Sequence, residues 1–359
     1  MLKTKIISYT YRFVIKPILF KIDAEVVHDF MSKIGEFLGS YKFTRNLTSL
    51  LFEYKNQKLE RTIDGIKFSN PVGLSAGFDY NGHLAGIMKS VGFGFNTVGT
   101  VTAKEYEGNT KPRLARLPKS KSLLVNKGFK SEGIDKILKR LDAMDLNGIT
   151  LGLSVGSSNI PEINTIQKAI NDYIYTFNKV KNKKYLKYLE LNISCPNTEM
   201  KESFVNTQNL ESLLIAIDKL KITKPIYIKM ANELSTIEME KLVELSIKHK
   251  CIRGFIFSNL VKNRTNKAFD KKEIKKVKNL KGNFSGKPTF DNSNELISYI
   301  SKKFGHKTTI IGCGGIFNAK DAKEKLNRGA KLVQMITGMI YEGPQVIGEI
   351  NRELAKHAT

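Results

Sequence analysis

Three short segments of the chain carry residue types that could do chemistry. The first, NISCPNT (residues 192–198), places two asparagine amides and the thiol of Cys195 around a proline. A cysteine thiol has an ordinary pKa of about 8.5, and it can act as a base or nucleophile where its surroundings lower that value. The polar neighbours of Cys195 favour this role over that of a small buried apolar residue.

The second and third signals are a pair of glycine loops and a lysine. Closely spaced glycines in GCGGI (312–316) and TGM (337–339) let backbone N–H groups approach an anion, which predicts a phosphate site. Lys229 ends an apolar run, where a charge is costly unless an anion pairs with it. The plainer alternatives are glycines that only make tight turns and a lysine that extends to solvent.

Metal and disulfide chemistry is not expected. The three cysteines are far apart without a CxxC pair, and the five histidines are isolated along the chain. This pattern predicts no metal site and no disulfide framework, and it favours a reducing, cytosolic setting.

The chain of 359 residues is strongly basic, with 59 Lys and Arg against 34 Asp and Glu and a net charge of +25. Such a charge suits a membrane surface or a nucleic acid. The lysines are spread along the whole chain, however, which is typical of solvated faces. We therefore expect no nucleic-acid partner, and attraction to a membrane surface stays open.

The elements that would position these residues follow a regular alternation. From about residue 65, apolar β-branched runs alternate with amphipathic charged stretches, which predicts a parallel sheet covered by helices. Eight such runs indicate an α/β fold of the TIM (β/α)8 barrel type, with a doubly wound open sheet as the alternative. The chemistry of a barrel lies at the C-terminal ends of its strands, where the polar and glycine residues gather. The runs are 71–78, 95–102, 149–156, 188–194, 225–231, 251–259, 308–316 and 331–338.

Residues 1–45 form a separate amphipathic helical segment before a barrel domain of residues 46–359. Apolar residues recur at three-to-four spacing, and we expect Pro17 to separate two helices and Asp23 to cap the second. No run has the ~18 to 20 apolar residues of a spanning helix, and scattered lysines argue against a signal peptide. The segment could lie in a membrane interface or pack onto its own domain.

Taken together, the motifs resemble those of the dihydroorotate dehydrogenases over almost the whole chain. The N-terminal stretch FVIKPILFKIDAEVVHDF is similar to the helical extension of the quinone-linked, membrane-associated class of that family. The motifs, in chain order, are KFSNPVGLSAGFDYNG, VGFGFNTVGTVT, GNTKPRLARLP, NISCPNT, YIKMA, FSGKP, IIGCGGI and GAKLVQMITGMIYEGP.

The resemblance implies an FMN enzyme of pyrimidine (UMP) biosynthesis that oxidises dihydroorotate to orotate and passes electrons to quinone. It implies a peripheral position on the cytoplasmic face of the cell membrane. Cys195 would be the base that removes the C5 proton of the substrate. The residues implied to bind FMN are Ala76, Gly77, Thr100, Asn192, Lys229, Ser258, Gly286, Gly314, Gly315, Thr337 and Gly338. The residues implied at the substrate are Tyr80, Asn126, Gly128, Phe129, Asn192, Asn197 and Asn259.

The chain departs from the family pattern mostly around the substrate. Cys195 stands where the quinone-linked class usually has Ser, and Tyr80 stands where the family usually has a Lys beside substrate and flavin. Lys127 or another cation would have to supply the lost charge. Asn126 is shifted by one residue, Ser154 replaces an Asn, and a hydroxyl residue is replaced by leucine at position 260 (Leu260).

Three alternatives stay open at this point. One is a tRNA dihydrouridine synthase, another FMN barrel with an Asn-x-x-Cys-Pro loop, whose phosphate contacts a +25 charge would suit. A second is a dihydroorotate dehydrogenase with a soluble electron acceptor. The third is a flavin-binding membrane-surface protein that has lost turnover, which Tyr80 and Leu260 would explain.

Overall fold

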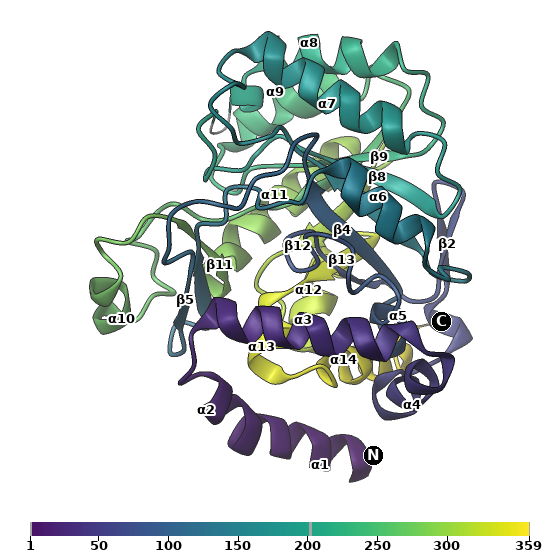
Figure 1. Cartoon of the computed structure of the whole chain (residues 1–359), viewed down its shortest axis with the longest axis vertical. Coiled ribbons are helices and arrows are strands. Elements are labelled where there is room, and N and C mark those ends of the chain that lie inside the picture. The colour runs from purple at the N-terminus through teal and green to yellow at the C-terminus, as the bar shows by residue number, and fades with distance from the viewer. Residues whose placement is uncertain (1, 201–202, 359) are drawn as a thin grey trace.

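The computed structural model describes residues 2–200 and 203–358, and its centre is a closed barrel of eight parallel strands (Figure 1). Each strand pairs with the next along the chain, and the last pairs with the first, as the alternation predicted. The open-sheet alternative is therefore wrong. The barrel strands are β3 (Val72–Leu74), β4 (Phe95–Val101), β7 (Leu151–Val155), β8 (Leu186–Asn192), β9 (Ile226–Lys229), β10 (Ile252–Phe257), β12 (Thr309–Cys313) and β13 (Leu332–Met335).

Helices cover the outside of the barrel because each has one apolar face. In α6, for example, Ile134, Ile137, Leu138 and Leu141 are buried at helical spacing. The helices around the barrel are α5 (Met88–Val91), α6 (Ile134–Asp142), α7 (Ile166–Val180), α8 (Thr207–Asp218), α9 (Thr236–Ser246), α11 (Phe290–Phe304), α12 (Ala319–Asn327), α13 (Thr337–Glu342) and α14 (Val346–Ala355).

Aromatic side chains close the barrel at the N-terminal ends of its strands. Phe68, from the hairpin of β1 (Arg61–Ile63) and β2 (Ile66–Phe68), packs edge-on against Phe95 and also contacts Tyr188. This end is filled with side chains, so a ligand can enter the barrel only at the opposite rim.

The N-terminal segment is helical, but its break does not lie at Pro17. α1 (Leu2–Thr10), a π-helical turn (Tyr11–Ile15) and α2 (Lys16–Leu19) form one continuous run through Pro17. The turn just before α2 is π-helical, so the regular i→i−4 hydrogen bonds that a proline would interrupt are already altered at this point. The chain turns at residues 20–23 instead, and Asp23 caps α3 (Ala24–Ser40) by accepting from two backbone N–H groups, as predicted.

A further helix and a small sheet complete the rim. α4 (Lys42–Phe52) follows α3 directly and spans the expected boundary at residue 45. An antiparallel sheet of β5 (Leu114–Leu117), β6 (Ser122–Val125) and β11 (Asn283–Gly286), with α10 (Lys271–Lys276) beside it, was not predicted as strands. Short 3-10 turns lie at Gln57–Leu59, Ser203–Val205 and Lys287–Thr289. Among the helices of residues 2–200 and 203–358, none has the length and apolar character needed to span a bilayer.

Candidate functional site

Two adjoining cavities lie at the C-terminal rim of the barrel. The glycine-lined cavity is bounded by Gly286, Gly314, Gly315 and Gly338 together with Lys229. The helix-covered cavity, of about 670 Å³, lies between the rim and the N-terminal helical segment, whose π-helical turn (Tyr11–Ile15), α2, α3 and α4 contribute lining residues. Residues that line both are Ala76, Asn192, Asn259, Leu260, Ser285, Ile336 and Thr337. All the residues expected at a cofactor line the glycine-lined cavity except Gly77 and Thr100, which line the other.

The glycine-lined cavity has a wall that only glycine can form. Gly314 and Gly315 have φ angles of 106° and 72°, in the left-handed region that glycine favours. A Cβ on Gly315 would come within 2.5 Å of the Phe290 side chain, and one on Gly338 would overlap the carbonyl oxygen of Ile316. The loops therefore keep their backbone close to the cavity, as an anion cradle requires.

Lys229 ends β9 and is buried. Its Nζ lies 3.2 Å from Ser75 Oγ and 3.2 Å from Cys313 Sγ, and no carboxylate within salt-bridge distance of it is found among the described residues. Glu190 lies on the neighbouring strand inside the barrel, and burial raises its pKa against the opposing effect of Lys229 and of its hydrogen bonds. An anionic group bound in the glycine-lined cavity would therefore pair with the ammonium of Lys229.

The asparagine amides of the rim are held by hydrogen bonds between strand ends. Asn192 Nδ2 donates to Thr100 Oγ1 at 2.9 Å, and Thr100 Oγ1 lies 3.0 Å from Ser154 Oγ. Asn259 Nδ2 donates to the carbonyl of Ser194 at 2.9 Å, and Ser194 Oγ donates to the carbonyl of Lys229 at 2.6 Å. Ser154 therefore supports the rim through a hydroxyl at the position where the family resemblance leads one to expect an amide.

Cys195 and Asn197 line the helix-covered cavity. Cys195 follows β8 and is 9% exposed, beside the rim residues that both cavities share. Asn197 Nδ2 donates to the carbonyl of Val125 at 3.1 Å, and its Oδ1 accepts from Asn283 at 2.6 Å. The loop of Cys195 is thereby attached to the small antiparallel sheet.

Asn126 is the one expected substrate residue that does not line either cavity. Its Oδ1 accepts from Asn109 Nδ2 at 2.9 Å, and the same Nδ2 lies 2.8 Å from the carbonyl of Asn197. Asn109 also accepts from Tyr106 and Asn159, so it connects three loops of the rim. Sequence reasoning missed Asn109 although it lies in the motif GNTKPRLARLP, because nothing in that motif shows which loops its side chain connects.

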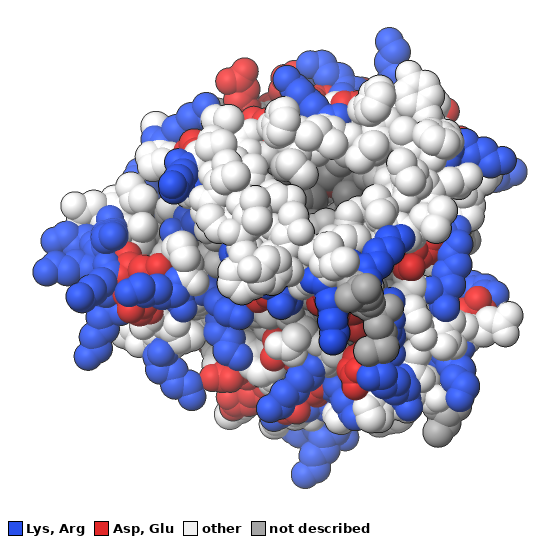
Figure 2. Space-filling view, turned by 90° about the horizontal axis from the view of Figure 1, so that it is seen from below, with Lys and Arg blue, Asp and Glu red and all other residues white. Residues whose placement is uncertain are grey.

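The helix-covered cavity is mostly apolar and opens among the N-terminal helices. Figure 2 shows an uncharged area around a hollow in the upper part of the view, with Lys and Arg at its edges and a mixture of basic and acidic residues below it. Gly128 and Phe129, both expected at a substrate, line its rim side, as does Tyr80. The apolar lining from the helices includes Ile15, Leu19, Val27, Phe30, Met31, Ile34 and Leu38.

A buried ion cluster attaches α3 to the rim. Glu25 of α3 lies 2.6 Å from Lys127 Nζ, 3.1 Å from Arg113 Nε and 3.7 Å from Lys130 Nζ. Burial alone would raise the pKa of Glu25, but hydrogen bonds and charge attraction from Lys127 and Arg113 outweigh it and lower the pKa to about 2. The sequence offered no signal for this cluster, because its members come from distant segments.

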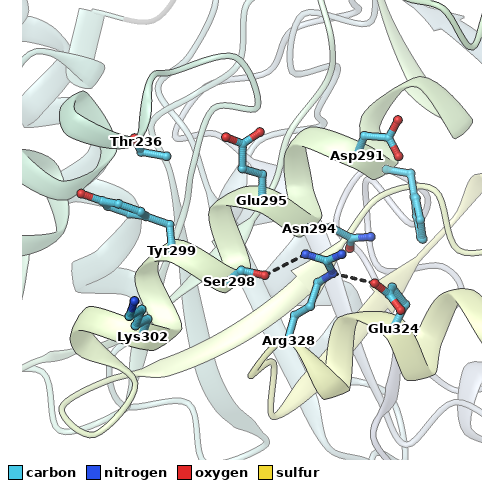
Figure 3. Close-up of a pocket in the computed structure, with 10 residues that line it drawn as sticks. Thr236, Asp291, Asn294, Glu295, Ser298, Tyr299, Lys302, Glu324 and Arg328 are labelled. Atoms are coloured by element: carbon cyan, nitrogen blue, oxygen red, sulfur yellow. Dashed lines mark hydrogen bonds and ion pairs between the residues drawn. The ribbon is translucent and has the colours of Figure 1, made fainter.

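A third depression lies outside the barrel, between α11 and α12 (Figure 3). Arg328 donates to Ser298 Oγ at 2.9 Å and to Glu324 at 2.7 Å across it. Both acidic and basic side chains line it, and none of the residues expected at a site does. We therefore place the candidate site in the two rim cavities.

Comparison with known proteins agrees with the geometry. The dihydroorotate dehydrogenase family matches residues 58–357. The chain is 35% identical to a dihydroorotate dehydrogenase (quinone) of Christiangramia forsetii, covering 96% of this chain and 98% of the relative. It is 33% identical to another of Synechococcus sp., over 96% and 93%. Its fold is similar to the crystal structure of an Eimeria tenella dihydroorotate dehydrogenase in complex with ferulenol, with a TM-score of 0.80, 25% identity and coverage of 93% and 92%.

Proposed function

The chain belongs to the dihydroorotate dehydrogenase family, and from that premise we propose that it oxidises dihydroorotate to orotate with FMN as cofactor and a quinone as electron acceptor. The observation that carries this proposal is the convergence of the expected cofactor residues and Cys195 on two adjoining cavities at one rim. The family match over nearly the whole barrel makes the RNA-modifying alternative the weaker one.

The glycine-lined cavity fits FMN by its shape and its donors. The backbone of Gly314, Gly315 and Gly338 lines the cavity and packs so close to Thr289, Phe290 and Ile316 that a Cβ would force it to shift. Its N–H groups can therefore approach a phosphate, and Thr337 adds a hydroxyl. Lys229 offers a cation to the electron-rich part of the flavin ring, and Asn192 and Ser258 offer polar contacts. When bound, the flavin accepts the hydride equivalent that leaves the substrate ring.

The substrate would lie between the asparagine amides and Cys195. Its ring carries several N–H and C=O groups, which match amides such as those of Asn192, Asn197 and Asn259. Cys195, as thiolate, takes the C5 proton of the ring. The burial of Cys195 at the rim keeps water from competing for that proton.

The acceptor and the membrane association are proposed from the N-terminal helices. An apolar cavity lined by residues of the π-helical turn, α2, α3 and α4 suits an apolar quinone and leads to the residues shared with the glycine-lined cavity. The same helices expose Ile6, Phe13, Ile18, Val26, Phe30 and Phe37, and cations border this face (Figure 2). We propose that this face docks peripherally on the cytoplasmic surface of the cell membrane.

The test is a two-step flavin experiment. Purified protein is expected to be yellow, to bleach when dihydroorotate is added anaerobically, and to regain its colour faster with a quinone than with fumarate or NAD. Protein that binds FMN and does not bleach would contradict the proposed substrate. Faster reoxidation by fumarate or NAD would contradict the proposed acceptor.

A further inference from the structure

The helix-covered cavity contains few charged groups, although the proposed substrate is an anion. Among the described residues, the only Arg and Lys side chains that line it are those of Arg116 and Lys127. Dihydroorotate and orotate carry a carboxylate, and burying it without a cation would be costly. Lys229 of the adjoining cavity is assigned to the flavin, so these two residues are the candidates to meet the carboxylate, if the proposed function holds.

Arg116 lies on the side of the N-terminal turn. Its guanidinium stacks 4.8 Å from the centre of the Phe20 ring, and Nη1 donates to the carbonyl of Ile22 at 2.6 Å. Both contacts belong to the turn between α2 and α3. Arg116 thus borders the apolar part of the cavity.

Lys127 lies on the side of the asparagine amides. Two residues before it, the carbonyl of Val125 accepts from Asn197. Two residues after it, the Phe129 ring packs beside Gly156. A Cβ added to Gly156 would meet both Phe129 and Thr100, so these two side chains lie on the same side of Gly156. Thr100 in turn accepts from Asn192. The segment of Lys127 is therefore fixed on both sides by residues that contact the expected substrate amides.

Glu25 pairs with the Lys127 ammonium, but its single negative charge does not neutralise the three cations around it. One carboxylate faces Lys127, Arg113 and Lys130, so the cluster has a net charge of about +2 when all four groups are ionised. Lys127 is buried, and its Nζ lies 5.3 Å from the centre of the Tyr80 ring, which also lines the cavity. The cluster thus keeps a net positive charge beside Tyr80.

We propose that Lys127 binds the carboxylate of the substrate and that Glu25 of α3 is the positioning residue that holds its ammonium at the cavity wall. This inference rests on the proposed function and specifies its substrate recognition. It makes the docking of α3 a condition for tight substrate binding, because Glu25 enters the site from the N-terminal helices.

The test compares ligands with and without the carboxylate on the FMN-loaded, full-length protein. Lys127→Met removes the charge and keeps most of the volume. We expect it to raise KM for dihydroorotate by about tenfold to a hundredfold, as loss of a charge-assisted contact does. Binding of uracil, followed through the flavin absorbance, should stay unchanged, so the preference for orotate over uracil falls by the same factor.

Lys130→Met is the matched control. Lys130 also faces Glu25, but it does not line the cavity and its side chain is 29% exposed. We expect Lys130→Met to leave the preference for orotate within about twofold of the wild type. Lys127→Arg, which keeps the charge, should retain most of the preference that Lys127→Met loses.

Glu25→Gln tests the positioning role and serves as a second variant if Lys127→Met does not fold. It should raise KM for dihydroorotate while kcat and uracil binding stay near those of the wild type. An orotate preference that is unchanged in both Lys127→Met and Glu25→Gln would overturn the inference while leaving the proposed function intact. A wild-type protein that binds FMN but neither binds orotate nor reacts with dihydroorotate would instead overturn the proposed function, and this inference with it.

Discussion

At the scale of single residues, Cys195 is nearly buried and still lines the cavity in which the substrate ring would bind. It follows β8, and its loop is attached to the small sheet through Asn197. These constraints leave little freedom for the thiol to move away from the rim. Its chemistry can therefore be tested by replacing the sulfur alone.

Cys195→Ala should slow flavin reduction by dihydroorotate by about 10²- to 10⁴-fold, because a positioned base is lost. FMN content should not change, since the cofactor contacts are elsewhere. Stopped-flow absorbance with dihydroorotate measures the rate. Cys195→Ser should retain part of the rate and need a higher pH, because a hydroxyl ionises less readily than a thiol. Wild-type rates in the alanine variant would rule out Cys195 as the base.

Gly315 is the residue at which the phosphate cradle can be tested. Gly315→Ala should lower FMN affinity at least about tenfold, because its Cβ would clash with Phe290 and force the loop that lines the cavity to shift. Gly65→Ala is the matched control, with φ of 78° against 72° and open space around the added methyl. Both variants should lose about 1 kcal/mol from the left-handed backbone, and only Gly315→Ala should lose flavin. Flavin fluorescence after dialysis reports this difference.

At the scale of elements, α3 is attached to the barrel by charge as well as by apolar packing. The Glu25 carboxylate sits among three cations, and a second contact joins Glu36 of α3 to His83 at 2.7 Å. Because these partners lie in the rim loops, the position of α3 depends on the ionisation of its carboxylates.

The pKa of Glu25 predicts acid sensitivity. Its folded-state pKa is lowered from 4.5 to about 2, so its stabilising contribution is fully present above pH 4.5 and is lost as pH falls toward 2. The full contribution is about 3 kcal/mol. Chemical denaturation at pH 6 and pH 3 should show a smaller loss of stability for Glu25→Gln than for the wild type. Glu105→Gln, at an exposed pair with Lys136, should behave like the wild type. Equal acid sensitivity of all three proteins would contradict the prediction.

At the scale of the whole molecule, the N-terminal helices and the barrel have different roles. The barrel fixes the rim loops, and the N-terminal helices lie along one side of it (Figure 1). Residues 11–52 of these helices cover the helix-covered cavity, and the same helices expose several large apolar side chains. An apolar face of this kind is unusual on a protein that stays in water. The net charge of +25 adds attraction toward anionic lipid.

Membrane docking can be tested by changing that face. Phe13 and Ile18 are 65% and 59% exposed, and replacing both by Glu should reduce binding to phosphatidylglycerol-containing vesicles at least about tenfold. Ile237→Glu, at a residue 63% exposed on α9, should leave binding unchanged. Cosedimentation measures the bound fraction, and binding of the wild type should weaken as salt increases. If the double variant binds as the wild type does, this face is not the docking surface.

The sequence by itself determined the barrel and the residues at its rim. Continuous apolar β-branched runs that alternate with amphipathic helices are typical of a parallel sheet covered by those helices, and glycine and amide residues at the C-terminal ends of the runs then meet at one rim. The cap of α3 at Asp23 was also predictable, because an N-cap depends only on residues that are close in the sequence. The helical break did not follow Pro17, because the chain passes through a π-helical turn just before it and stays helical to Leu19.

Only the tertiary structure decided which distant groups meet. The pairing of Glu25 with Arg113 and Lys127, and the place of Asn109 between loops, depend on contacts across long stretches of chain. No local pattern encodes such contacts, because each partner is an ordinary polar residue in its own segment. Periodicity reports which face of an element is buried, whereas the choice of partner for a buried charge is made when the elements pack together.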